Sequence, residues 1–165
     1  MDYREIRLEN LDVLNGKPYH NHQALEFWTP AMYVPFGLDH YRNNWGEKYD
    51  VKLSFRNEQG QFLTKFMNKI KVLDAYFKRV HNGTEYHSML KNEQYLVVKL
   101  PYVNEKFLCG VKSKHEPLPT AFSIKKGCWV RCLLKADKVW KHQGRSGCLL
   151  VAKEIIILQS DEIDE

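Results

Sequence analysis

The sequence predicts a mostly β or α+β single domain, such as a five-stranded Greek-key barrel that carries one inserted amphipathic helix. Strand-like segments lie on both sides of one helical pattern, and no long linker separates them. This order of elements is typical of such barrels. The chain has 165 residues, 44% of them hydrophobic and 27% charged, which is enough for one independent core.

The strand signals before the helix differ in quality. From Leu25 onward, aromatic and β-branched residues predict a strand, but Pro30 and Pro35 restrict it to an edge or bent strand. Residues 37–47 are expected to form a loop. Residues 48–56 alternate between apolar and polar side chains, which predicts a half-buried strand.

The helical pattern follows. Apolar side chains recur at three- and four-residue spacing, which predicts an amphipathic helix with lysines on its other side. These apolar side chains are Phe62, Phe66, Ile70, Leu73, Phe77 and Val80. We expect the helix to end near Asn82 and Gly83, which form a C-terminal stop signal.

Four strand-like segments come after the helix, at residues 94–103, 106–112, 127–140 and 147–158. In the third, one face is expected to be core and the other exposed. The core face comprises Val130, Cys132, Leu134 and Ala136, and the exposed face includes Arg131 and Lys135. We therefore divide the chain into an N-terminal arm or edge segment (1–24), a barrel domain (25–158) and a flexible acidic tail (159–165).

The charge is distributed unevenly along the chain. The net charge is +5, but residues 1–158 hold 25 basic and 16 acidic side chains and thus carry +9. A basic body suggests an anionic partner, most often nucleic acid, although a merely solubilising surface would look the same. The chain has no signal-peptide pattern and no apolar run long enough to span a bilayer, so we expect an intracellular protein.

The usual signatures of enzymes and cofactors do not occur. The sequence contains no GxxxxGK[ST], GxGxxG, HExxH or GxSxG motif, and we expect no catalysis and no cofactor. The four cysteines lie in apolar segments, where small core side chains are commoner than nucleophiles. Cys128 and Cys132 would lie about 13 Å apart on a strand, too far for one zinc ion, so we expect no metal site.

Aromatic and basic residues alternate along the predicted strands and turns. Single-stranded nucleic acid is held by cations on its phosphates and by flat side chains on which its bases stack. For Trp45, Tyr102 and Trp140, the sequence is equally consistent with an exposed ring and with a buried one. We expect the nucleic-acid-binding side chains to be Tyr41, Arg42, Trp45, Lys48, Lys52, Tyr102, Lys106, Arg131, Lys135, Lys138, Trp140, Lys141 and Arg145.

A family resemblance rests on several short pieces in a fixed order. These are Thr29-Pro30, Pro35-Phe36-Gly37, the strand from Lys48 to Phe55, the strand start at Gly127, and the hairpin of Trp140, Gly144 and Gly147. Over roughly residues 25–165 the chain resembles the single-stranded DNA-binding proteins of nucleocytoplasmic large DNA viruses. It is similar in layout to the single-stranded DNA-binding protein of short-tailed bacteriophages.

The resemblance implies an OB-fold that binds single-stranded DNA with little sequence preference during viral DNA replication, recombination or repair, in the host cytoplasm or nucleus. It also implies that the acidic end, Asp161, Glu162, Asp164 and Glu165, contacts replication proteins such as a DNA polymerase. We expect this tail to compete for the cationic groove. The alternatives are an RNA-binding or transcription accessory protein and a nuclease, whose carboxylates would have to cluster around a metal. Self-association stays open, and no membrane partner is expected.

Overall fold

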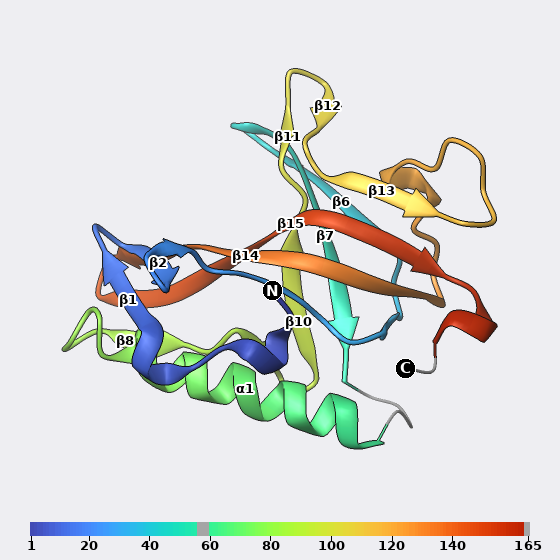
Figure 1. Ribbon diagram of the computed structural model, residues 1–165. Coiled ribbons are helices and arrows are strands. Elements are labelled where there is room, and N and C mark those ends of the chain that lie inside the picture. The colour runs from blue at the N-terminus through green and yellow to red at the C-terminus, as the bar shows by residue number, and fades with distance from the viewer. Residues whose placement is uncertain (56–59, 164–165) are drawn as a thin grey trace.

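The computed structural model describes residues 1–55 and 60–163, which form a mostly β structure with one α-helix in this part of the chain (Figure 1). The last residue of the strand predicted at 48–56 lies outside the described residues. Within the described residues, no helix combines the length and the apolar character that a membrane crossing requires.

Five strands close into a barrel. They are β5 (Met32–Val34), β7 (Gly46–Ser54), β10 (Tyr95–Lys99), β14 (Cys128–His142) and β15 (Arg145–Leu158). Strand β7 is antiparallel to β5 and β10, β10 is parallel to β15, and β14 is antiparallel to both β15 and β5. The order of strands around the barrel is thus β5, β7, β10, β15, β14 and back to β5. Numbered along the chain, this is the order 1-2-3-5-4-1. This is a five-stranded Greek-key OB-fold, and the predicted fold class is confirmed.

Shorter strands extend the barrel at its edges. Strand β4 (Glu26–Trp28) pairs with β14, and β8 (Glu85–His87) and β13 (Gly110–Ser113) are parallel to β15. Strand β9 (Leu90–Lys91) pairs with β10. A separate hairpin, β11 (Tyr102–Val103) with β12 (Lys106–Phe107), projects from the connection that follows β10 (Figure 1).

The expected loop at residues 37–47 is wrong. Strand β6 (Leu38–Asn43) forms a regular hairpin with β7, with Asn43 opposite Gly46. This strand has no buried residue. Its sequence therefore lacks the alternation of apolar and polar side chains that predicts a half-buried strand. Its backbone pairing with β7, rather than a buried face, holds it in place.

The predicted helix is confirmed as α1 (Gly60–Lys78), inserted between the second and third barrel strands, but it ends before the expected stop near Asn82, so Val80 lies in the turn beyond it. Its buried side chains repeat at helical spacing and are Leu63, Phe66, Ile70, Leu73 and Phe77. The Phe66 ring lies 5.7 Å from that of Phe55 and 6.3 Å from that of Phe27, measured between centroids. The helix therefore contributes its apolar face to the barrel core, and its other side exposes Lys65, Lys71 and Lys78.

The N-terminal residues 1–24 are packed against the rest of the domain. Two 3-10 turns, η1 (Tyr3–Glu5) and η2 (Leu8–Asn10), precede a small sheet of β1 (Leu11–Leu14), β2 (Lys17–His20) and β3 (Gln23–Ala24). Tyr3 and Ile6 are each only 1% exposed. Lys69 Nζ and the Tyr76 hydroxyl on α1 donate hydrogen bonds to main-chain oxygens of this segment. The expected arm or edge segment thus shares the core of the barrel.

Candidate nucleic-acid interface

The outer face of the barrel around β10 carries a row of basic side chains. Along β10, Leu96 and Val98 are buried and point inward, so Lys99 points outward. Lys99 lies opposite Val151 on β15, and Val151 lies opposite Lys135 on β14. The pairing of three strands therefore brings these lysines into one line across the barrel surface.

A hollow of about 230 Å³ opens on this face, and we call it the barrel groove. Its lining includes Lys48, Lys99, Tyr102, Asp137 and Leu149. Burial lowers the pKa of Lys99, and the neighbouring positive charge of Lys48 lowers it further. Two ammonium groups that repel each other at the mouth of a groove are stabilised by an anion between them, and phosphate is an anion that lysine commonly binds.

The carboxylates at the rim of the barrel groove have cationic neighbours of their own. Arg42 Nη2 lies 2.7 Å from Glu47 Oε1, and Lys135 Nζ lies 3.6 Å from Asp137 Oδ1. Because these acids are neutralised locally, they oppose a phosphate on Lys48 and Lys99 less than free carboxylates would.

Trp140 sits beside the barrel groove in a second hollow, of about 180 Å³, that shares Leu149 with it. It faces Gly147 across the β14–β15 hairpin, and any Cβ at Gly147 would lie only 2.7 Å from the Trp140 ring. The indole therefore lies flat on the neighbouring strand, in a space that only glycine leaves open. The His87 ring is nearly parallel to it at 6.3 Å. Trp140 is half-buried, so part of the ring stays available to a ligand.

Two hairpins stand on the other side of the barrel groove. Trp45 forms the tip of the β6–β7 hairpin and is 90% exposed. The β11–β12 hairpin lies beside it (Figure 1), and Tyr102 on that hairpin packs on Tyr49 of β7 with ring centroids 4.9 Å apart. Tyr102 is half-buried, whereas Lys106 at the start of β12 is exposed. The three aromatic residues left open by the sequence thus differ: Trp45 is free, and Tyr102 and Trp140 are partly covered.

Most of the other predicted binding residues fall into three groups. Lys52 lies on the same face but its Nζ is 2.7 Å from Asp39 and 3.6 Å from Asp50, so its charge is offset within the sheet. Tyr41 and Arg42 are exposed on β6. Lys138, Lys141 and Arg145 are exposed along the β14–β15 hairpin and extend the basic surface beyond Trp140.

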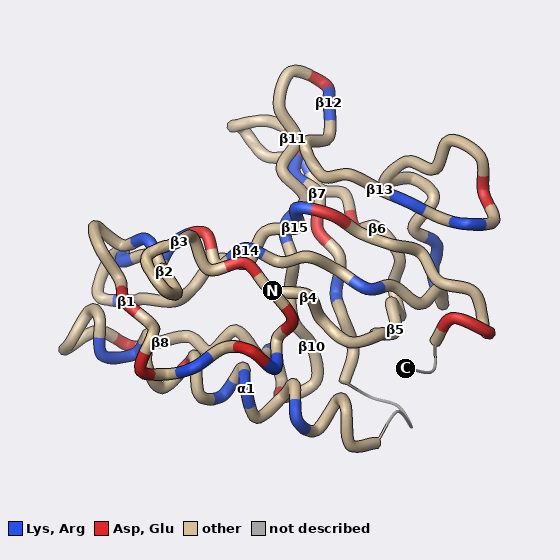
Figure 2. Tube along the Cα trace, viewed as in Figure 1, with Lys and Arg blue, Asp and Glu red and all other residues tan. Residues whose placement is uncertain are grey.

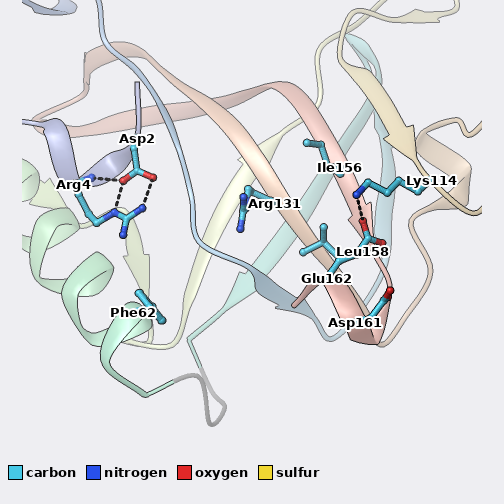
Figure 3. Close-up of a pocket in the computed structure, with 9 residues that line it drawn as sticks. All are labelled: Asp2, Arg4, Phe62, Lys114, Arg131, Ile156, Leu158, Asp161 and Glu162. Atoms are coloured by element: carbon cyan, nitrogen blue, oxygen red, sulfur yellow. Dashed lines mark hydrogen bonds and ion pairs between the residues drawn. The ribbon is translucent and has the colours of Figure 1, made fainter. Parts of the chain in front are cut away.

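Arg131 lies apart from these residues. It lines a separate hollow of about 740 Å³, the largest of those described, between the N-terminal segment and the C-terminal turn (Figure 3). Asp2 and Arg4 form an ion pair on one wall, and Glu162 and Lys114 form another on the opposite wall. Its lining holds three carboxylates and three cations, and two of each are already joined in these ion pairs.

The acidic end begins beside this hollow. Residues Ser160–Glu162 form the turn η4, and Asp164 and Glu165 lie outside the described residues. Glu162 Oε1 accepts a hydrogen bond from the Gln159 amide, and its carboxylate lies 3.4 Å from His115 Nε2. The turn lies at the far end of β15 from the Trp140 hairpin, about 40 Å along the strand at the usual rise (Figure 2). Asp161 and Glu162 thus lie beside β13 and not over the barrel groove.

One group of metal-binding side chains comes together in the described part of the chain. The ligand atoms of His115, Asp161 and Glu162 lie within 4.8 Å of one another. Since Glu162 is already engaged with Gln159 and Lys114, the ion pairs of the turn account for this cluster.

The cysteines have the properties of core side chains. Cys132 is fully buried, and burial raises its pKa well above the usual value. Burial also raises the pKa of Cys128 to about 11 and of Cys109 to about 12, and it raises the pKa of Cys148 as well. All four thiols are therefore protonated at neutral pH and are poor nucleophiles.

Sequence reasoning missed Lys99. It ends the apolar run Leu96-Val97-Val98, and strict alternation from Leu96 would have placed it on the outer face. The sequence could not show that β7 brings Lys48 next to it, because that proximity depends on the strand register.

Neither a protein-family model nor a curated protein matches the chain. Among solved structures, the single-stranded DNA-binding protein from bacteriophage Enc34 in complex with single-stranded DNA is similar to it, with a TM-score of 0.49. The two are 11% identical, and the similarity covers 92% of this chain and 94% of that chain. At this level of similarity the function of the chain has to be inferred from its own residues.

Proposed function

We propose that this chain binds single-stranded DNA across the barrel groove, without catalysis and with little sequence preference. The observation that carries the proposal is the Lys48 and Lys99 pair at the groove, flanked by the exposed Trp45 and the half-buried Trp140. Lysines attract phosphates, and flat rings stack on bases only when the bases are unpaired. Together these features favour a single strand over a duplex.

The wider role follows from the resemblance of the sequence and is part of the same proposal. The chain would coat single strands in viral DNA replication, recombination or repair inside the host cell, as one of the single-stranded DNA-binding proteins of nucleocytoplasmic large DNA viruses. The acidic residues Asp161, Glu162, Asp164 and Glu165 would contact a replication protein such as a DNA polymerase.

Fluorescence anisotropy with matched single-stranded DNA, RNA and duplex DNA tests the proposal. We expect the tightest binding to single-stranded DNA, with a logarithmic salt dependence of about −0.7 per phosphate contacted. Tighter binding to RNA would favour the alternative, an RNA-binding or transcription accessory protein. Equal affinity for duplex, or an affinity that does not respond to salt, would contradict the proposal.

Trp140→Ala is expected to weaken single-stranded DNA binding by about 1–3 kcal/mol, because one stacked base loses its platform. The matched control is Trp129→Ala in the same strand, since Trp129 is also half-buried but packs on Tyr33, with ring centroids 5.6 Å apart. Gly147→Ala should weaken binding too, because its methyl group displaces the indole. Normal affinity of a folded Trp140→Ala protein would mean that this ring only supports the hairpin.

A further inference from the structure

A fourth hollow, of about 320 Å³, lies along β6 and is separate from the barrel groove; we call it the edge pocket. Its lining includes Phe36, His40, Phe122, Lys125 and Lys126. Phe36 is 49% exposed and Phe122 is 58% exposed, which is unusual for large apolar rings that a protein could bury. Exposed aromatic rings beside lysines are a feature of surfaces that bind unpaired bases.

The two exposed rings are held in fixed orientations. Phe122 meets Phe107 edge-on at 5.5 Å, and the Phe36 ring lies 5.8 Å from that of Tyr95. Phe122 belongs to the turn η3 (Ala121–Ser123), which Thr120 caps by accepting a hydrogen bond from the Phe122 amide. The rings are therefore preorganised and lose little freedom when a ligand stacks on them.

The backbone that carries the two lysines is also fixed. The Leu38 amide donates to the Ile124 oxygen at 3.2 Å, and the Gly127 amide donates to the Val34 oxygen at 2.8 Å. Gly37, with a φ of +69°, allows this close approach, because a Cβ there would lie 2.9 Å from the main-chain nitrogen of Lys126. Lys125 and Lys126 are exposed on a loop that these hydrogen bonds hold in place.

The charge around the edge pocket favours an anion. Of the described residues that line it, none is a carboxylate. The nearest acid to His40 is Glu47, at 3.5 Å from its Nε2, and this carboxylate is already paired with Arg42. The two lysines therefore act on a ligand without a competing negative charge inside the pocket.

The edge pocket meets the outer face that bears the barrel groove at one place, the contact between Phe36 and Tyr95. Tyr95 and Lys99 both point outward from β10, four residues and about 13 Å apart. Phe36 packs on Tyr95 and also lines the edge pocket, so its ring connects the two surfaces. A single DNA strand that leaves the barrel groove and follows β10 therefore reaches Tyr95 and then Phe36.

We propose that the edge pocket is a second subsite, in which Phe36 and Phe122 stack on an unpaired base and Lys125 and Lys126 contact its phosphates. The inference rests on the proposed function and deepens it, because it gives the strand a path across β10 to the edge of β6. A strand long enough to follow this path contacts both sites, whereas a short strand occupies the barrel groove alone.

The test compares a double variant, Phe122→Ala with Lys125→Ala, against a matched control, Leu118→Ala with Lys65→Ala. Leu118 is 93% exposed on the loop before η3 and Lys65 is exposed on α1, so the control removes one apolar side chain and one charge elsewhere. Anisotropy is measured with oligothymidylates of about 4 and about 16 nucleotides, the limits of what one OB-fold covers.

We expect the double variant to bind the long oligomer about tenfold more weakly and the short one normally, with no change in the control. Equal weakening for both lengths, or no weakening for either, would overturn the second subsite. Failure of the unmodified protein to bind either oligomer would instead refute the proposed function, and this inference with it. The two failures are therefore distinguishable.

Discussion

Reversing the charges of Lys48 and Lys99 together, by Lys48→Glu with Lys99→Glu, is expected to weaken single-stranded DNA binding about 100-fold at about 50 mM salt. At that salt each released counterion contributes about one order of magnitude to the affinity, and two contacts are lost. The slope of affinity against salt, both on logarithmic scales, should become shallower by about 1.4. Anisotropy titrations over a range of salt concentrations measure both quantities.

The control for this variant has the same change in net charge. Lys65 and Lys71 are exposed on α1 and do not line the barrel groove, so Lys65→Glu with Lys71→Glu alters only the overall field. Because the new glutamates would lie near Glu47 and Asp137, the melting temperatures of both double variants are measured as well, and affinities are compared between folded proteins. If both double variants lose affinity to the same extent, binding depends on overall charge and the groove has no special part in it.

The sequence was a good guide to the barrel because its inner face repeats with a simple period. In β14, every residue predicted to be core is buried, with Val130, Cys132 and Leu134 fully so. The helix was predictable for the same reason, since its apolar side chains recur at helical spacing. Burial imposes these periods on the sequence, and they can be read back from it.

The parts that escaped prediction are those whose position depends on distant partners. Strand β6 has no buried face, and residues 1–24 bury only isolated side chains such as Tyr3 and Ile6. The candidate site was predictable in kind but not in composition. Basic residues next to aromatic ones indicated the binding chemistry, yet only the strand register brings Lys99 to Lys48 and leaves Arg131 in a different hollow.

Phe66→Ala is expected to lower the free energy of unfolding by about 3–5 kcal/mol, which is a large part of the stability of a domain of this size. Phe66 is fully buried where the helix, the barrel and the N-terminal segment meet. Its ring lies 5.0 Å from Tyr3, 5.7 Å from Phe55 and 6.3 Å from Phe27. Removing it leaves a cavity that three separate parts of the chain would have to fill. Urea unfolding followed by circular dichroism measures the change.

Val72→Ala is the control on the same helix, because Val72 is 42% exposed and should change the stability by no more than about 0.5 kcal/mol. Two further variants test the role of the N-terminal segment: Tyr3→Ala alone, and Tyr3→Ala combined with Phe66→Ala. Because the rings of Tyr3 and Phe66 are in contact, the two losses should be non-additive by about 0.5–3 kcal/mol. Strict additivity would mean that the N-terminal segment does not stabilise the barrel through this contact and behaves as the arm that its sequence suggested.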